Sequence, residues 1–194
     1  MTASENTLAS GKFFRFWSAA NEPRAVVLIS HGLGEHSGRY EHVAAALTAD
    51  NLDVYAPDHI GHGKSPGKPA YIDRFSDLTS GVSELRDHIR RHHAGLPVIL
   101  IGHSMGGLIA IRLALGAHAD YAGLILTGPL LGQPEAPSCL QVMLIRVLSV
   151  VAPKVKAIEI DASAVSRDPA VVSDYIADPL VHHDNIPART LVSL

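Results

Sequence analysis

The chain has 194 residues, a hydrophobic fraction of 47%, a charged fraction of 18% and a formal net charge of −3, the values of an ordinary globular protein. Its basic residues do not gather beyond short runs such as 90–93, which excludes a nucleic-acid groove. Cys139 is the only cysteine, and the sequence has neither a signal-peptide core nor an apolar run of the roughly 18 residues that span a membrane, so we expect a cytoplasmic protein.

Short apolar runs alternate with amphipathic stretches over the first 128 residues. In chain order we expect strands over 13–20, 25–31, 53–58, 97–102 and 123–128, and helices over 39–50, 75–93 and 104–116. Continuous runs rich in β-branched residues, such as 25–31, are typical of strands buried on both faces. The alternation predicts an α/β fold with βαβ units, a mainly parallel sheet and helices on both of its faces.

This alternation stops at Pro129. Beyond it the sequence predicts helices over 140–152, around 168–176 and from about 187, and no buried strand. We therefore expect a helical insertion after the last strand.

The segment Gly102-His103-Ser104-Met105-Gly106-Gly107 falls between a predicted strand and a predicted helix. Where a chain turns sharply from strand to helix, the positions on either side of the turn have room only for glycine. The serine at the turn is then left exposed on a strained backbone. The sequence therefore predicts a nucleophile elbow built from Gly102, His103 and Gly106 around a catalytic Ser104. The alternative is a purely structural turn.

A second glycine-containing segment, residues 31–40 (HGLGEHSGRY), also follows a predicted strand. Small residues there allow backbone amides to approach a reacting carbonyl, and an oxyanion hole takes one amide from such a loop and one from the residue after the nucleophile. We assign these donors to Leu33 and Met105. The alternative is a plain glycine turn into a helix.

Histidines are frequent in the loops at this edge of the predicted sheet: His31, His36, His59, His62 and His103. No acidic or cysteine ligand pattern accompanies them, so we expect no metal site and interpret these histidines as hydrogen-bonding groups that hold the loops. The pairs 92–93 and 182–183 are interpreted as surface or cap residues. No cofactor is expected.

Four segments together carry a family resemblance: HGLGEHSGRY (31–40), DHIGHGKSPG (58–67), GHSMGG (102–107) and DPLV (178–181). With them the chain resembles the monoacylglycerol lipase and lysophospholipase branch of the α/β-hydrolases, which also contains serine aminopeptidase-like proteins. The resemblance implies that 1–129 form the N-terminal part of the core, 130–187 a helical cap and 188–194 the start of the C-terminal core. It also implies that the helix over 140–152 faces an acyl chain or a membrane surface; packing on the core is the alternative.

The sequence departs from this family in the second half of the catalytic triad. The order in this fold is Ser, then Asp or Glu, then His, and the family's later strands that carry the acid and base have no counterpart here. The only histidines after Ser104 are His118, His182 and His183. The alternative is that His182 or His183 serves as the base, with Asp178 or Asp184 as the acid. We therefore expect a truncated chain that lacks its C-terminal strands, with a bare sheet edge through which it dimerises or associates.

The resemblance implies a serine carboxylic-ester hydrolase that acts on lipid-like monoesters, such as monoacylglycerol or lysophospholipid, through an acyl-enzyme on Ser104. This chain alone would be inactive without its acid and base. One alternative is an aminopeptidase-like serine peptidase, for which the cap offers Glu135, Glu159 and Asp161 to bind a substrate amino group. The other is an inactive hydrolase that serves as a binding module.

Overall fold

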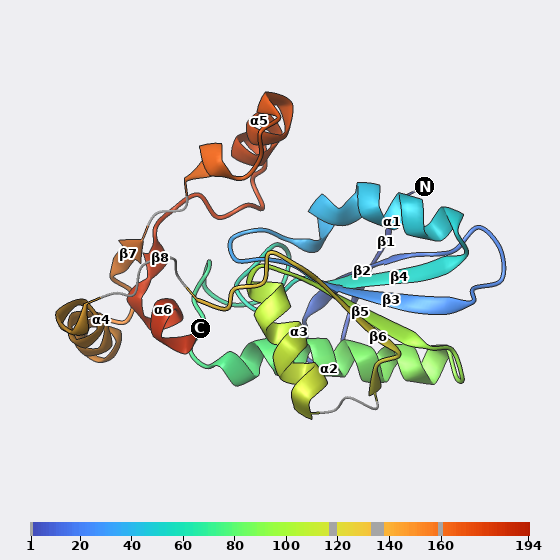
Figure 1. The fold of residues 1–194 in the computed structure, drawn as a ribbon, viewed down its shortest axis with the longest axis horizontal. Helices are drawn as coiled ribbons and strands as arrows, with labels where there is room; N and C mark the ends of the chain where they lie inside the picture. Colours follow the sequence, from blue (N-terminus) through green and yellow to red (C-terminus); the bar gives the residue numbers. More distant parts are fainter. Residues whose placement is uncertain (1, 117–119, 133–137, 159–160) are drawn as a thin grey trace.

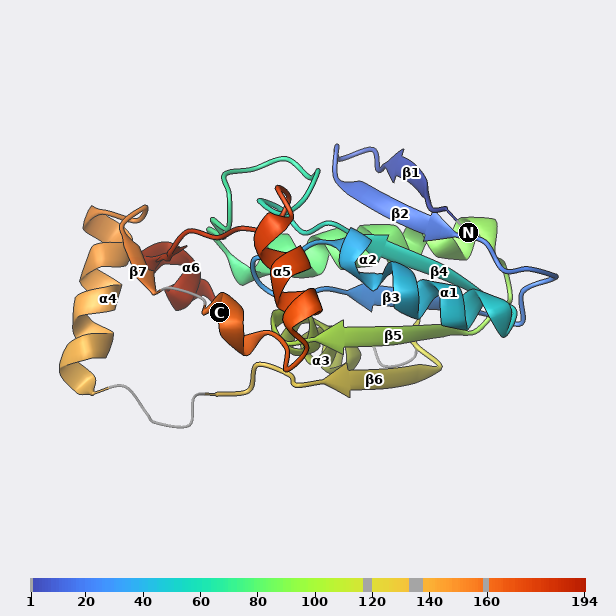
Figure 2. The ribbon, with the colours of Figure 1, turned by 90° about the horizontal axis from the view of Figure 1, so that it is seen from above.

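A six-stranded sheet forms the main body of the computed structural model, which describes residues 2–116, 120–132, 138–158 and 161–194. The strands lie in the order β1-β2-β4-β3-β5-β6 (Figure 2). Strands β4, β3, β5 and β6 are parallel, whereas β1 and β2 form an antiparallel hairpin along β4. Their bounds are β1 Ser4–Thr7, β2 Phe13–Trp17, β3 Ala25–Ser30, β4 Leu52–Pro57, β5 Val98–His103 and β6 Gly123–Thr127.

Helices cover both faces of the sheet (Figure 1). One face carries α1 (Glu41–Ala49), preceded by the 3-10 helix η1 (Ser37–Tyr40), and the other carries α2 (Phe75–His92) and α3 (Met105–Gly116). Because side chains alternate along a strand, β3 contributes to two cores: Val26 and Leu28 pack with α2 and α3, whereas Val27 and Ile29 pack towards α1. The prediction that 25–31 is buried on both faces is confirmed.

The polar hairpin strand β1 was not predicted from the sequence. All four of its residues are exposed, so it has no apolar alternation, and only its pairing with β2 defines it. The predicted strand over 13–20 is shorter than expected and ends at Trp17. With β1 counted, Ser104 follows the fifth strand of the chain.

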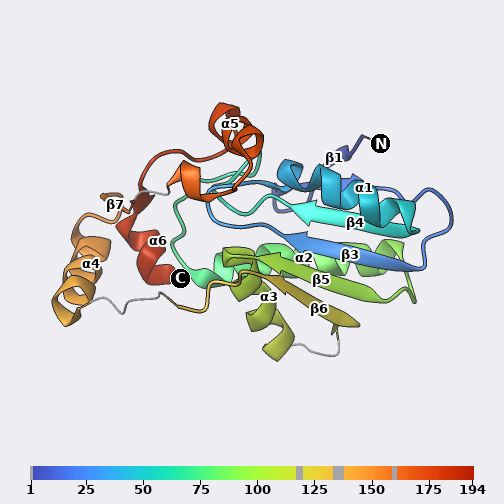
Figure 3. The same ribbon diagram turned by 45° about the horizontal axis from the view of Figure 1, so that its top comes forward.

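Beyond β6 the chain forms a set of short elements past the carboxyl ends of the parallel strands (Figure 3). They are α4 (Cys139–Val151), β7 (Lys156–Ile158), η3 (Ala162–Ala164), α5 (Pro169–Ala177), β8 (Ile186–Pro187) and α6 (Ala188–Ser193). The three predicted helices are found, but the expectation of no buried strand is wrong for β8, whose two residues are buried. The β7–β8 pair could not be predicted from the sequence, because strands this short show no hydrophobic periodicity.

The C-terminal end of this region is held against the core by hydrogen bonds of Thr190 in α6. Its hydroxyl donates to the carbonyl of Ala70 at 2.7 Å and accepts from the amide of Ile72 at 2.9 Å. Thr190 is fully buried, so both hydrogen bonds are shielded from water. The region after β6 is therefore anchored to the core where it returns as well as where it leaves the sheet.

Candidate active site

Ser104 lies at the turn between β5 and α3, with a left-handed backbone φ of +51°. This conformation is costly for any residue with a Cβ, so the surrounding structure has to hold it. The Ser104 carbonyl accepts hydrogen bonds from the amides of Gly107, Leu108 and Leu130, and its own amide donates to the carbonyl of Thr127. The strained turn that the sequence predicts at Ser104 is thus present.

The glycines of the elbow are required by close backbone packing. A Cβ at Gly102 would lie 2.4 Å from the Gly106 carbonyl oxygen, and one at Gly106 would lie 2.0 Å from the Ser30 carbonyl oxygen. Gly107 is equally constrained, since a Cβ there would lie 2.7 Å from the Pro129 Cβ. His103 is exposed, and its Nδ1 contacts the hydroxyl and carbonyl oxygens of Thr127.

Two backbone amides near Ser104 have no acceptor among the described residues, those of Leu33 and Met105. Met105 is the first residue of α3, and amides of a first helical turn have no partner within their helix. The loop that carries Leu33 passes close to Ser104, because a Cβ at Gly32 would lie 3.3 Å from the Ser104 Cβ. The assignment of the oxyanion hole to these two amides remains a prediction, which this arrangement favours.

Glu35 is a site residue that sequence reasoning did not single out. Its Oε1 accepts from the Gly32 amide at 2.6 Å and from the Tyr40 hydroxyl at 2.7 Å, and its Oε2 lies 3.6 Å from Arg39 Nε. Burial, reinforced by the Glu35 charge, raises the pKa of Tyr40, so this phenol stays a donor. Glu35 therefore fixes the loop beside Ser104; its position within the 31–40 motif was the available signal.

The buried rings of His31, His59 and His62 form the histidine cluster of the loops. His31 Nδ1 lies 2.8 Å from the Gly32 carbonyl, which only accepts, so His31 Nε2 is free to accept from the His59 amide at 3.0 Å. His59 Nε2 in turn contacts the Ser30 hydroxyl at 3.0 Å. The interpretation of these histidines as loop-holding groups agrees with these contacts.

Burial keeps this cluster uncharged. Burial lowers the pKa of His31 and takes the pKa of His59 well below its ordinary value. It also lowers the pKa of His62 to about 3, with a smaller contribution in the same direction from the neighbouring imidazoles of His31 and His182. No group of three or more His, Cys, Asp or Glu side chains able to hold a metal ion is found in the described part of the chain.

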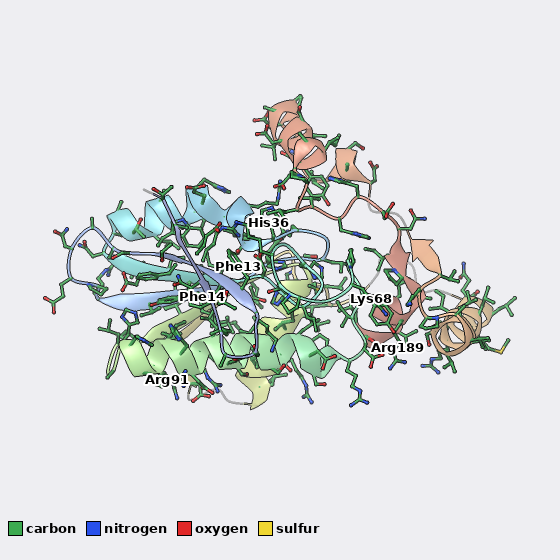
Figure 4. The ribbon with its side chains drawn as sticks, turned by 180° about the vertical axis from the view of Figure 1, so that it is seen from behind. Phe13, Phe14, His36, Lys68, Arg91 and Arg189 are labelled. Carbon is green, nitrogen blue, oxygen red and sulfur yellow. The ribbon has the colours of Figure 1, made fainter. Side chains whose placement is uncertain are left out.

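The segment after α5 docks on the loop that carries Leu33 and Glu35. His36 Nε2 lies 2.8 Å from Asp178 Oδ2, while His36 Nδ1 accepts from the Gly38 amide at 3.1 Å. The His182 amide donates to the Gly34 carbonyl at 2.8 Å. Figure 4 shows His36 at this junction, below α5. The DPLV segment is therefore part of the wall around the candidate site.

The histidines considered as alternative bases within the described residues, His182 and His183, make no hydrogen bond to Ser104. The Ser104 hydroxyl has no hydrogen bond within the described residues, and His183 Nε2 is 3.1 Å from the Asp178 carbonyl. His118 lies outside the described residues, as do Glu135 and Glu159. The reading of 92–93 as plain surface is corrected for His93, which is partly buried with its Nε2 2.8 Å from the Tyr55 hydroxyl.

Helix α4 leaves most of its apolar side chains exposed. Only Ser149 is fully buried, and the partly buried Val142, Ile145 and Leu148 occupy the remaining inner positions. The exposed apolar side chains of this helix are Leu140, Met143, Leu144, Val147, Val150 and Val151. None of the helices in the described ranges is both long and apolar enough to cross a membrane.

Comparison with known proteins gives a family match over residues 21–194, to the family described as serine aminopeptidase, S33. The chain is 40% identical over 181 residues to a monoacylglycerol lipase of Mycolicibacterium smegmatis, covering 92% of this chain and 65% of the relative. It is 41% identical over 170 residues to the human monoglyceride lipase, covering 87% and 56%. It thus spans less than two thirds of either relative.

A solved monoacylglycerol lipase from Paleococcus ferrophilus has the same fold. Its TM-score to this chain is 0.77 at 32% identity, over 97% of this chain and 67% of that structure. The expected α/β-hydrolase fold and the expected resemblance are therefore confirmed.

Proposed function

Because the chain belongs to the serine aminopeptidase S33 family, we propose that it carries the nucleophile of a serine hydrolase that cleaves lipid-like monoesters such as monoacylglycerol or lysophospholipid. The single observation that carries this proposal is the strained Ser104 turn, with an unengaged hydroxyl beside two unengaged amides. A substrate carbonyl would be polarised by the amides of Leu33 and Met105 while the Ser104 Oγ attacks it. The alcohol then leaves, and water releases the acyl group as a carboxylic acid.

The acid and the base of the triad are proposed to come from outside the described residues. In support, no described side chain hydrogen-bonds to the Ser104 hydroxyl, and Asp178 is engaged by His36 and by the Leu180 amide. We accordingly propose that Ser104 is held in place in this chain but is not activated, because a serine hydroxyl needs an adjacent base to become a strong nucleophile.

An ester substrate is favoured over a peptide by the cap. An aminopeptidase needs an unengaged carboxylate to bind the substrate amino group, and Asp161, the candidate within the described residues, uses its Oδ1 to accept from the amide and hydroxyl of Ser163. The apolar surface of α4 suits an acyl chain or a lipid layer better than a charged peptide terminus.

The experiment is an intact-mass measurement of the chain after incubation with an alkyl fluorophosphonate, with and without imidazole as an external base. We expect little adduct without imidazole and a single adduct with it, absent from Ser104→Ala. An aminoacyl phosphonate should label far more slowly. Labelling of Ser104→Ala, or no labelling of wild type under any condition, would contradict the proposed nucleophile. Rapid labelling without imidazole would place the base within this chain.

The exposed face of α4 is proposed to make peripheral contact with a lipid surface. The exposed face carries a single charge, that of Arg146, among apolar side chains such as Val150, which is 77% exposed. Such a helix lies in the interface plane and gains free energy by burying its apolar side chains. Val150→Glu should lower co-sedimentation with phospholipid vesicles, whereas Asp77→Asn on α2 should not; equal binding of both variants and wild type would exclude this contact.

The outer edge of β6 is proposed as an association surface between chains. It pairs with β5 on one side only, and Leu124 and Ile125 are 39% and 48% exposed. Exposed apolar edge strands pair readily with other chains, and a lysine on the edge opposes this pairing. Sedimentation velocity should show self-association of wild type that is reduced in Ile125→Lys; a monomeric wild type over the accessible concentration range would rule it out.

A further inference from the structure

Arg39 lies between the loop beside Ser104 and the helix α5. Its Nε is 3.6 Å from Glu35 Oε2, and its guanidinium carbon is 4.8 Å from the centroid of the Tyr175 ring. A guanidinium within about 6 Å of an aromatic ring centroid is attracted to the face of that ring. Because Glu35 belongs to the loop after β3 and Tyr175 to α5, Arg39 connects the core loop to the region after β6.

These contacts are largely shielded from water. The side chains of Arg39 and Glu35 are 19% and 14% exposed, and Tyr175 is 5% exposed. Opposite charges attract each other more strongly where water is excluded. Tyr175 is the buried residue of α5, so it is the point through which this helix packs on the core, on the α1 side of the sheet (Figure 1).

Glu35 in turn contacts the backbone that presents the Leu33 amide. The Gly32 carbonyl and the Leu33 N–H belong to one planar peptide unit, so the direction of the carbonyl fixes the direction of the N–H. His31 Nδ1 lies 2.8 Å from this carbonyl oxygen, and Glu35 Oε1 accepts from the Gly32 amide at 2.6 Å. A glycine backbone is otherwise free to rotate. The direction of the Leu33 N–H therefore depends on where the Glu35 carboxylate is held.

We propose that Arg39, held by the Tyr175 ring, is a positioning residue for the Leu33 amide, so that the docking of α5 determines how well the oxyanion hole is formed. This inference rests on the proposed function, in which Leu33 supplies one of the two donors. Without the Tyr175 ring, the guanidinium extends into water, because holding a long side chain costs conformational entropy. The Glu35 carboxylate then loses its cation, and the Gly32–Leu33 peptide unit loses a constraint on its direction.

The first readout is the amide proton resonance of Gly32 in the isotope-labelled chain, which requires no catalysis. A short hydrogen bond to a carboxylate moves this resonance downfield, so Tyr175→Leu and Arg39→Gln should both move it upfield. Arg39→Gln keeps the aromatic ring, which separates this effect from a ring-current change. Tyr175→Phe also keeps the ring and should leave the resonance in place, as should Ile176→Ala at an exposed position of α5. An unchanged Gly32 resonance in Tyr175→Leu would overturn the proposal.

The second readout is the rate at which the alkyl fluorophosphonate labels Ser104 with imidazole present, for variants whose folding is confirmed by circular dichroism. Tyr175→Leu should slow labelling about threefold to tenfold, whereas Tyr175→Phe and Ile176→Ala should match wild type. In a Glu35→Gln background Tyr175→Leu should have no further effect, because the connection is already broken. Effects that multiply would show that Tyr175 acts by another route, against the proposal. If wild type is not labelled, the proposed function fails, while the Gly32 resonance still decides this inference.

Discussion

The left-handed conformation of Ser104 makes a quantitative prediction about stability. At φ +51° a side chain costs about 1–2 kcal/mol that glycine does not incur, while glycine loses roughly 0.4–1 kcal/mol more conformational entropy on folding. Ser104→Gly should therefore be more stable than Ser104→Ala by about 1 kcal/mol. Ser104→Ala itself should match wild type, because the hydroxyl makes no hydrogen bond within the described residues.

The assay is urea unfolding followed by the fluorescence of Trp17, the only tryptophan, which is 1% exposed and therefore reports on the loss of the core. With a urea dependence of about 1–3 kcal/mol per molar, the midpoint of Ser104→Gly should lie roughly 0.3–1 M above that of Ser104→Ala. A chain of this size should also gain about 2–4 °C in melting temperature. A midpoint for Ser104→Gly at or below that of Ser104→Ala would refute the idea that the turn stores strain.

Gly106→Ala should lose about 1–3 kcal/mol or more of stability, because the new Cβ would lie 2.0 Å from a backbone oxygen. Gly116→Ala should not, because its Cβ would meet no described atom within 4 Å, and a Gly106→Ala variant as stable as wild type in urea unfolding would contradict the packing. Thr190→Val leaves the Ala70 carbonyl and the Ile72 amide unpaired and should lower the free energy of unfolding by about 1–3 kcal/mol in the same assay. Thr190→Ser keeps the hydroxyl and should stay close to wild type; equal stability of all three proteins would show that water replaces the hydroxyl. Burial is the largest single influence on the pKa of Asp178 and raises it, but the hydrogen bonds from His36 and the Leu180 amide, together with nearby positive charge such as that of Arg39, lower it more, so its folded pKa lies below its unfolded value. Its stabilising effect is then full above about pH 4 and is lost as the pH falls through the folded pKa, so the difference in urea midpoint between wild type and Asp178→Asn should shrink between pH 5 and pH 3; a constant difference would oppose this reasoning.

The sequence was most informative where a segment is decided by its own residues. The continuous apolar run of β3 specifies a doubly buried strand without reference to any partner, and the glycines at 102 and 106 specify a tight turn because no side chain fits there. The central strands and the elbow could therefore be predicted.

Features that depend on distant partners could not be predicted in this way. Strand β1 consists of four exposed polar residues and exists through its pairing with β2. His36 and Asp178 are 142 positions apart, and His93 is partly buried by its contact with Tyr55 on a neighbouring strand. No local pattern contains such contacts, because they arise only when the topology brings the segments together.

The double anchoring of the region after β6 has a consequence for how such a protein can diversify. The chain leaves the core at Leu130, whose amide is bound by the Ser104 carbonyl, and is fixed to it again through Thr190 on the loop at Ala70 and Ile72. The length and composition of what lies between these two attachments are not dictated by the register of the sheet. Insertions, deletions or wholesale replacement there would exchange one surface beside the candidate site for another, while the Ser104 turn stays as it is.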